Sequence, residues 1–417
     1  MKNWRIKLSL FLNYFVFAIL LNSVGTVILQ VQNNFGVSEA SASTLEAFKD
    51  LSIAITSFLL ASYIVRIGYK RAMLIALGFI TVVALAMPIM PAFWSAKLLF
   101  AATGVCFALI KVSVFATIGL VTDSEKEHVS FMNFLESFFM VGVLSGYFIF
   151  SAFVDDANPQ STSWFEVYYL LAGIAAVAFV LLLTTRLDES KVQQDEGKGI
   201  TGEFVDMLKL VAKPLVLVFI GSVFLYVLIE QGLMSWLPTF NKRVFDLPTS
   251  LSIQMTSILA ASLAVGRFAG GFVLKEIHWF KVLSFCIIAA AALMLVTLSM
   301  AGEGTHHEVT GWTNAPVAAY FLPLIGICLA PIYPAINSVI LSHLPVKQHA
   351  PMSGLIVVFS ALGGTTGSII TGNLFGVFEG REQVAFYLLL IPVALILVVL
   401  YLFKKETDKI PFEGGGH

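Results

Sequence analysis

Five ionisable side chains interrupt long apolar runs in the first half of this chain. A charged side chain within a membrane-spanning helix costs about 3 kcal/mol or more, so such residues normally face a cavity or a partner of opposite charge. Carboxyl and ammonium groups in that setting carry protons, form ion pairs that open and close, or bind polar solutes. The five residues are Glu46, Lys49, Asp50, Lys111 and Glu136.

Glu46, Lys49 and Asp50 are spaced so that they share one side of a helix. One interpretation is an acidic pair whose proton affinity is set by Lys49, or a gate of ion pairs that break when the protein opens. The alternative is an interfacial ion pair whose charged ends reach toward the lipid headgroups.

Lys111 lies near the middle of its apolar run, and Glu136 lies one or two turns into the next run. Antiparallel neighbouring helices would bring the two side chains within reach of each other. Protonation of Glu136 would then release Lys111 to hold an anionic or hydroxyl-rich substrate. The alternative is a static pair that only fixes helix packing.

In the second half, Glu230, Gln231 and Trp236 combine an acidic group, an amide and an indole. Such side chains bind sugars by hydrogen bonding and ring stacking. Gln231 and Trp236 are equally consistent with packing, and a tryptophan at the end of a membrane span is often an interfacial anchor.

Tyr333 and Asn337 lie on one predicted helix with Pro331 and Pro334, which should loosen that helix and expose carbonyl groups to a cavity. Tyr333 stands in the second half where Lys111 stands in the first. Asn22, near mid-depth in the first apolar run, is a further candidate ligand, although polar residues there usually join helices. We therefore add Asn22, Tyr333 and Asn337 to the candidate substrate-binding residues.

The composition requires a membrane to position these residues. Hydrophobic residues make up 58% of the chain, charged residues only 12%, and the mean hydropathy is +0.88. We predict an all-α integral membrane protein with twelve transmembrane helices. The predicted spans are 8–31, 43–66, 72–92, 95–122, 130–153, 163–186, 213–238, 250–275, 279–300, 315–344, 350–375 and 383–404.

An internal repeat predicts two pseudo-symmetric six-helix bundles. GVCFALIKVSVF begins at Gly104 and GICLAPIYPAIN at Gly326, and each is followed at distances that agree to within one residue by a Lys-x-His triplet and by a glycine, Gly142 or Gly363. Two homologous halves place a binding site between them. The predicted parts are an N-terminal bundle at 1–186, a charged cytoplasmic linker at 187–212, a C-terminal bundle at 213–404 and a cytoplasmic tail at 405–417.

The distribution of positive charge predicts the orientation. With both termini in the cytoplasm, the cytoplasmic segments hold 18 of the 25 Lys and Arg residues and the outer segments hold four. The first apolar run is too long for a cleavable signal peptide and lacks a small-residue cleavage site, so we interpret it as the first span.

Two loop sequences resemble those of the major facilitator superfamily. The second half has Gly266-Arg267 followed by Gly270-Gly271 at the end of its predicted second span. In the first half the acidic residue that usually precedes the Arg is replaced by Val65. The first-half loop, between predicted spans two and three, reads Arg66-Ile67-Gly68-Tyr69-Lys70-Arg71.

Within that superfamily the chain resembles the bacterial fucose permease branch of sugar:proton symporters. The resemblance lies in the stretch 224–236, in 265–270, and in Ile332-Tyr333-Pro334 with the glycine-rich run to Gly367. It implies a multi-pass protein of the bacterial inner membrane. The acidic residues used for protonation in that branch align near Gly25 and Leu109, so they are not transferred to this chain, whereas a sugar-binding polar position matches Glu136.

We predict a secondary active transporter rather than an enzyme, because the chain has no phosphate-binding Gly-rich loop and no catalytic triad pattern. The predicted activity is proton-coupled symport of a small polar solute such as a sugar, with no cofactor, and sodium is an alternative coupling ion. A proton-coupled drug or organic-anion exporter and a non-transporting membrane sensor are the alternative functions. We expect a monomer whose partners are the solute and the lipid bilayer. A nucleic-acid partner is not expected, because the net charge is −1. No metal site is expected, since His306-His307-Glu308 lacks helical ligand spacing.

Overall fold

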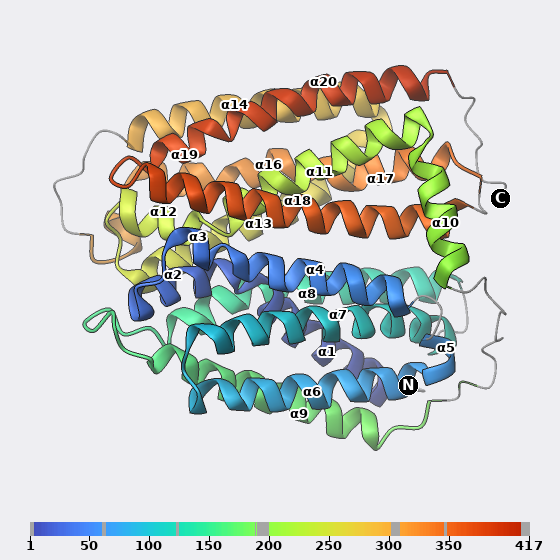
Figure 1. Cartoon of the computed structure of the whole chain (residues 1–417), viewed down its shortest axis with the longest axis horizontal. Helices are drawn as coiled ribbons and strands as arrows, with labels where there is room; N and C mark the ends of the chain where they lie inside the picture. The colour runs from blue at the N-terminus through green and yellow to red at the C-terminus, as the bar shows by residue number, and fades with distance from the viewer. Residues whose placement is uncertain are drawn as a thin grey trace. The chain divides into compact units, whose positions relative to one another are not determined.

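The computed structural model describes residues 4–60, 64–121, 125–187, 189, 200–301, 309–345 and 348–409. In these residues the regular secondary structure is entirely helical (Figure 1). The long helices coincide with the apolar runs, as expected for segments that must satisfy their own backbone hydrogen bonds in lipid.

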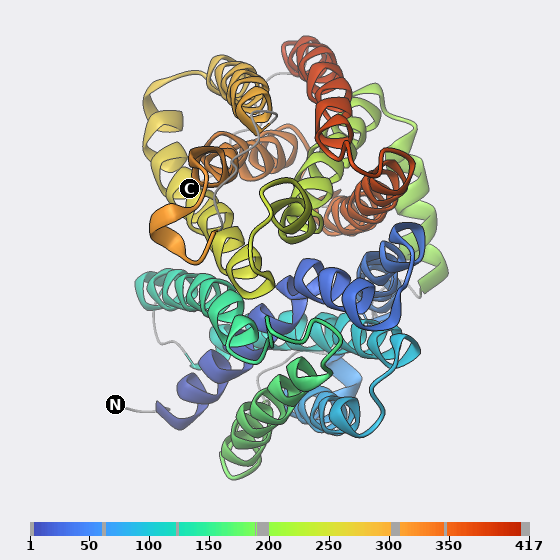
Figure 2. The same cartoon turned by 90° about the vertical axis from the view of Figure 1, so that its left-hand side faces the viewer.

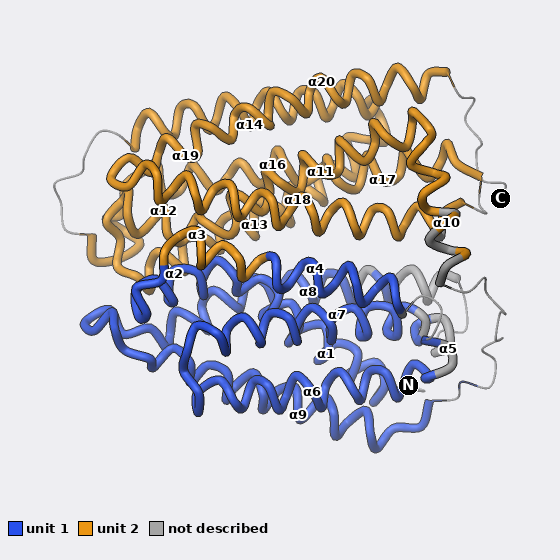
Figure 3. Tube along the Cα trace, in the orientation of Figure 1, with its two compact units in different colours: residues 1–37, 47–200 blue, residues 38–46, 201–417 orange. Residues whose placement is uncertain are grey.

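The chain divides into two compact units, residues 1–37 with 47–200 and residues 38–46 with 201–417 (Figure 3). Figure 2 looks along the helices of each unit, which run side by side. The helices of the first unit are α1 (Trp4–Asn22), α2 (Val24–Phe35), most of α4 (Thr44–Leu60), α5 (Ile64–Ile67), α6 (Tyr69–Ile89), α7 (Phe93–Val121), α8 (Glu125–Ser151) and α9 (Val167–Leu183).

The second unit contains one short helix from early in the chain, α3, together with the helices of the second half. The polypeptide therefore enters the second unit at residue 38 and returns to the first at residue 47. The helices of the second unit are α3 (Glu39–Ala42), α10 (Ile200–Val211), α11 (Pro214–Met234), α12 (Leu237–Val244), α13 (Thr249–Glu276), α14 (Trp279–Ala301), α15 (Val317–Phe321), α16 (Ile325–Leu329), α17 (Ile332–Ser342), α18 (His349–Val377), α19 (Gln383–Leu388) and α20 (Leu390–Thr407).

Eleven helical segments of the described residues are long and apolar enough to cross a membrane. The predicted span 43–66 is not among them, because α4 has 17 residues and residues 61–63 lie outside the described part. The multi-pass helical architecture is therefore confirmed, and the count of twelve stays a prediction.

Several of the predicted spans are interrupted by short breaks between helices. In the first, α1 ends at Asn22 and α2 begins at Val24, with Ser23 in the break. In the tenth predicted span, α16 ends at Leu329 and α17 begins after Pro331, since proline cannot donate a helical hydrogen bond. The seventh predicted span breaks after Met234, where α11 gives way to α12.

Repeated glycines bring equivalent helices into close contact in each unit. Gly142 of α8 lies against the backbone of Phe15 in α1, and Gly363 of α18 lies against the backbone of Phe224 in α11. One turn further along, Gly146 meets Ile19 and Gly367 meets Leu228. In both pairs of contacts, the same difference in residue number separates the α1 residue from its α11 counterpart. The sequence repeat therefore has a counterpart in helix packing.

Candidate functional site

A polar face in the first unit contains Lys111 of α7 and Glu136 of α8, and both side chains are exposed. An electrostatic interaction links the two charges, and Glu136 interacts in the same way with Tyr14 of α1. Tyr14 is buried, and its hydroxyl has no hydrogen-bond partner among the described residues. The structure thus brings the predicted pair into one electrostatic cluster and adds a tyrosine that sequence reasoning missed.

Aromatic rings surround this cluster. The Nζ atom of Lys111 lies 5.9 Å from the ring centroid of Phe107. Phe107 in turn packs 6.3 Å from Phe139, and Phe139 packs 5.7 Å from Tyr14. An exposed ammonium and carboxylate bordered by rings can hold the polar groups of a small solute and contact its apolar faces.

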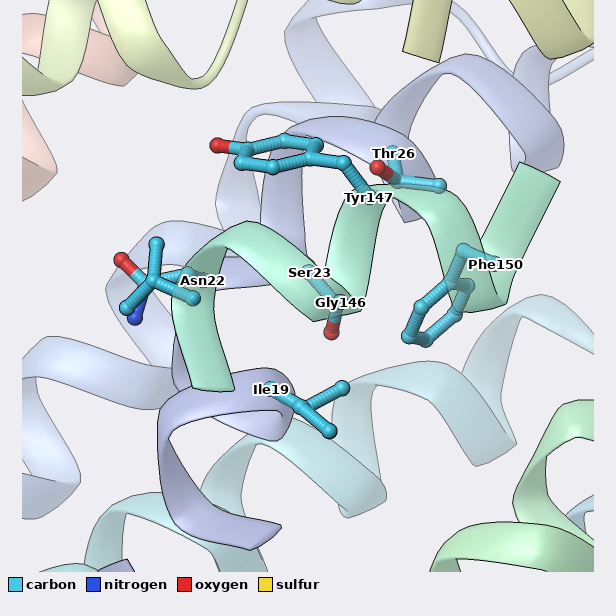
Figure 4. Close-up of a pocket in the computed structure, with 8 residues that line it drawn as sticks. Ile19, Asn22, Ser23, Thr26, Gly146, Tyr147 and Phe150 are labelled. Atoms are coloured by element: carbon cyan, nitrogen blue, oxygen red, sulfur yellow. The ribbon is translucent and has the colours of Figure 1, made fainter. Parts of the chain in front are cut away.

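Asn22 lies at the break between α1 and α2. Its Nδ2 donates to the carbonyl of Ala18 at 2.8 Å, which occupies one amide donor. Asn22 also lines a narrow crevice that is partly open to its surroundings. Figure 4 shows Asn22 and Phe150 toward opposite sides of this crevice, whose other lining residues are Ile19, Ser23, Thr26, Val143, Gly146 and Tyr147.

In the second unit, Glu230 is joined to a tyrosine and an arginine. Tyr226 donates its hydroxyl to Oε1 of Glu230 at 2.8 Å, across one turn of α11. Arg267 of α13 places Nη2 3.9 Å from the same oxygen. The contact between Tyr226 and Glu230 could have been predicted from their four-residue spacing on one helix. Arg267, in contrast, was predicted only as part of a loop motif.

Tyr333 and Asn337 of α17 extend this polar cluster. The ring of Tyr333 lies 5.7 Å from the ring of Tyr226, and its hydroxyl is 3.1 Å from the hydroxyl of Ser360 in α18. The Oδ1 atom of Asn337 is buried and has no hydrogen-bond partner among the described residues. The second cluster therefore combines charge, hydroxyl groups and an unused acceptor, as a site for a hydroxylated solute requires.

Gln231 and Trp236 occupy different surroundings. Gln231 is half-buried near the end of α11, whereas Trp236 is fully buried. The indole N–H of Trp236 donates to the carbonyl of Ser368 at 3.0 Å, and its ring packs 5.0 Å from Phe375. Trp236 thus lies in packing with α18, apart from the cluster around Glu230.

The glycine contacts place the predicted ligands at equivalent positions of the two units. The difference in residue number between Phe15 and Phe224 is the same as that between Asn22 and Gln231. Likewise, Lys111 and Tyr333 are separated by the same number of residues as Gly104 and Gly326. Each unit therefore carries polar side chains at the same two levels of equivalent helices.

The charged triplet at the start of α4 is divided between the two units. Glu46 belongs to the second unit, where it is completely buried and accepts a hydrogen bond from Ser235 at 2.9 Å. Lys49 and Asp50 belong to the first unit, and Nζ of Lys49 lies 3.5 Å from Oδ1 of Asp50.

Residues 38–46, which we call the α3 segment, are held to the second unit by further contacts that sequence reasoning missed. Arg243 of α12 binds Glu39 at 2.6 Å and lies 3.7 Å from Glu382. Gly372 of α18 leaves no room for a Cβ atom beside Ser43. Charge pairing, a buried hydrogen bond and close packing thus hold this segment together with α12 and α18.

The first-half loop motif is stabilised by a carboxylate from the predicted linker. Gly68 has φ = 86°, which favours glycine, and the backbone N–H of Lys70 donates to Glu189 at 2.7 Å. The Nζ atom of Lys70 donates to the carbonyl of Thr185 at 2.5 Å. Arg71 is exposed, and the side chain of Arg66 lies outside the described residues.

In the second half, Gly266 packs against the backbone of Ile327. The guanidinium group of Arg267 lies beside Glu230 of α11, so its ion-pair partner is on a helix and not in a loop. The described residues contain no group of three metal-ligating side chains. The segment His306-His307-Glu308 lies outside them.

A family model described as the Major Facilitator Superfamily matches residues 10–368. A relative named Protein TsgA homolog, from Yersinia pestis (strain Pestoides F), is 22% identical over 381 residues, covering 88% of this chain and 86% of the relative. The match of the family model spans most of the chain and both units.

Solved structures share the fold at low sequence identity. A bacterial homologue of the human lysosomal transporter Spinster, in an inward-facing and occupied conformation, gives a TM-score of 0.75 at 16% identity, covering 99% of this chain and 98% of that one. The nucleoside transporter NupG gives 0.74 at 16% identity, covering 99% and 100%. A D-xylose–proton symporter gives 0.72 at 13% identity and covers all of both chains.

Proposed function

This chain belongs to the major facilitator superfamily, and from that premise we propose that it carries out proton-coupled symport of a small polar solute such as a sugar or sugar derivative. It is a transporter rather than an enzyme. The observation that carries the proposal is the exposed Lys111–Glu136 pair on a membrane-spanning face of the first unit. The D-xylose–proton symporter among its structural neighbours supports the choice of solute and ion.

Glu136 is the proposed proton carrier of the first unit. With Glu136 ionised, its negative charge compensates the ammonium group of Lys111. Protonation of Glu136 removes that compensation, and Lys111 is then available to a hydroxyl or carboxylate group of the solute. Because an uncompensated charge on a membrane-spanning face is costly, proton and solute favour each other's binding.

Each unit carries proposed solute ligands at equivalent levels of its own helices. Asn22 and Lys111 contribute from the first unit, and Glu230, Gln231, Tyr333 and Asn337 from the second. Trp236 is proposed to support the site through its packing with α18, since its N–H is occupied by Ser368.

The proposed architecture is that of a twelve-helix secondary transporter. Two six-helix bundles, 1–186 and 213–404, are joined by the cytoplasmic linker 187–212, and the tail 405–417 is cytoplasmic. The protein is proposed to be a monomer in the bacterial inner membrane with both termini in the cytoplasm. The proton gradient across that membrane is its proposed energy source. Alternating access is the corresponding mechanism.

Glu46, Lys49 and Asp50 are the proposed gating residues. The burial of Glu46 against Ser235 and the short distance between Lys49 and Asp50 support this role. Breaking these contacts leaves charges in an apolar environment, so the closed arrangement is favoured until a change in occupancy offsets that cost.

The test uses the full chain in proteoliposomes with a pH-sensitive dye inside. Neutral sugars, amino sugars, acidic sugars and small carboxylates are added outside in turn. Internal acidification with one class establishes proton symport, and silence across all classes with folded protein rejects it. Solute uptake that depends on a sodium gradient would show that sodium, rather than the proton, is the coupling ion. Extrusion of apolar compounds would favour the exporter.

A variant pair assigns the coupling residue. Glu136→Gln is expected to abolish uphill uptake and to retain exchange of bound solute, because it removes the proton site and keeps the side-chain shape. Glu166→Gln, at an exposed carboxylate of the same unit, is the matched control. Equal loss of uphill uptake and exchange in Glu136→Gln would show that the pair is structural.

A further inference from the structure

Glu230 of α11 and Arg267 of α13 form an ion pair between two helices that are long and apolar enough to cross a membrane. Apart from the first and last three residues of each helix, α11, α13, α14, α17 and α18 carry no other acidic or basic side chain in the described residues. Ionisable side chains within membrane-spanning helices are costly, so this pair is a candidate functional site.

The pair leaves most of the guanidinium group unused. Its closest approach is 3.9 Å, at the outer limit for an ion pair, and the side chain of Arg267 is 47% exposed whereas that of Glu230 is 13% exposed. Arginine carries five N–H donors in a planar fork that matches a carboxylate in two places. Glu230 is the one ion-pair partner that the described residues provide for Arg267.

Glu230 is fixed by another residue, so it is a poor candidate to close on Arg267. The hydroxyl of Tyr226, which is fully buried, donates to the same Oε1 atom at 2.8 Å. Nearly half of the Arg267 side chain is exposed, and its ion-pair partner Glu230 is also held by Tyr226.

The residues around Glu230 and Arg267 suit hydroxyl groups. The ring of Tyr333, which is partly exposed, lies 5.7 Å from the buried ring of Tyr226 and is inclined to it by 31°. Tyr333 and Ser360 contribute hydroxyl groups at 3.1 Å from each other, and Asn337 contributes a buried acceptor without a partner in the described residues. A carboxylate at Arg267 would place the rest of a small hydroxylated molecule beside these groups.

We propose that Arg267 binds the carboxylate of an acidic sugar, so that the substrate class is a hexuronate or a similar sugar acid rather than a neutral sugar. This inference rests on the transport function proposed above and specifies its substrate. Glu230 is the internal counter-ion of Arg267 when the site is empty.

The charge balance of the site requires one proton for each anion bound. The empty pair is neutral, and a substrate carboxylate would leave the cluster with one net negative charge. Uptake of one proton by Glu230 restores neutrality, with Tyr226 still hydrogen-bonded to it. The titratable and charged groups that face Glu230 are Tyr226, Tyr333 and Arg267. Beyond its first residue, α18 has no titratable side chain, and those of α20 are confined to its last two turns.

The test measures equilibrium binding of glucuronate and glucose to the purified full chain by calorimetry. Buffers of different ionisation enthalpy report the protons taken up with the ligand. We expect glucuronate to bind at least 10-fold more tightly than glucose, because each tenfold corresponds to about 1.4 kcal/mol and a bidentate charged contact supplies at least that much. We also expect glucuronate to take up about one proton more per ligand than glucose does, because Glu230 binds that additional proton.

Two variants and a matched control assign the groups. Arg267→Gln is expected to weaken glucuronate binding at least 10-fold more than it weakens glucose binding, and Arg267→Lys is expected to restore glucuronate binding only in part. Glu230→Gln is expected to bind glucuronate with about one proton fewer per ligand than the parent protein. Lys275→Gln, two turns further along α13 and exposed, is expected to bind like the parent protein.

Equal affinity for glucuronate and glucose in the parent protein would overturn the inference even if a variant fails to fold. Unchanged proton uptake in folded Glu230→Gln would also overturn it, because the proton would then reside elsewhere. If neutral sugars alone drive proton uptake into proteoliposomes, the transport function stands and the sugar-acid inference fails. If no solute class is transported, the transport function itself fails.

Discussion

Replacing Arg243 by glutamine should release the α3 segment from the second unit. The substitution removes the 2.6 Å contact with Glu39 and the 3.7 Å approach to Glu382. A hydrogen bond between charged groups contributes about 1.5–3 kcal/mol. The side chains of Arg243 and Glu39 are 26% and 19% exposed, so solvent screens part of the attraction and the lower end of that range is the better guide.

The assay follows the burial of Ser43, which packs against Gly372 and is completely buried. A Ser43→Cys reporter is introduced after the native thiols have been replaced, and its reaction rate with a maleimide is measured. If the lower value of about 1.5 kcal/mol of stabilisation is lost, the rate should rise roughly 10-fold, since each 1.4 kcal/mol is a factor of ten. The native thiols are Cys106, Cys286 and Cys328.

The matched control is Arg381→Gln, which changes an exposed arginine beside Glu382 in sequence. Its rate should stay within about twofold of the parent, because most surface substitutions change stability by less than about 0.5 kcal/mol. An unchanged rate in Arg243→Gln would refute the reasoning, as would an equal rise in both variants.

Three further substitutions test local packing by thermal unfolding of the purified protein. Gly367→Ala should destabilise it by about 1–3 kcal/mol, because a Cβ atom would overlap the backbone of α11, whereas Gly271→Ala has open space and should be neutral or slightly stabilising. Asn34→Ala should cost about 2–4 kcal/mol, since it removes two hydrogen bonds to carbonyls and the acceptor of Trp164 Nε1; a loss below about 1 kcal/mol would contradict this. Gly68→Ala should cost about 1–3 kcal/mol through its positive φ, and an unchanged midpoint would show that the loop relaxes freely.

Predictions that rest on periodicity and repeats describe the helices well. Apolar length identifies the long helices because membrane spans must be apolar throughout. The paired glycines Gly142 and Gly363 mark the close contacts of α1 with α8 and of α11 with α18. This succeeds because a glycine needed for backbone approach recurs whenever the packing recurs.

Side-chain partners from distant segments were harder to predict. Arg267 follows a glycine that suggests a loop motif, yet its charge lies beside Glu230 on another helix. Glu39 and Arg243 are 204 positions apart and have no shared local pattern. Helical spacing relates residues on one helix, whereas such pairs depend on how helices rotate and pack against each other.

The membership of the α3 segment in the second unit has a consequence for the order of events during synthesis. Glu46 is made 189 residues before its partner Ser235. At synthesis rates of about 5–20 residues per second, this carboxylate waits roughly 10–40 s before the hydroxyl exists. Gly372, against which Ser43 packs, is made later still. The start of α4 therefore reaches its final surroundings only near the end of translation, which makes the junction at residue 47 one of the last parts of the first unit to mature.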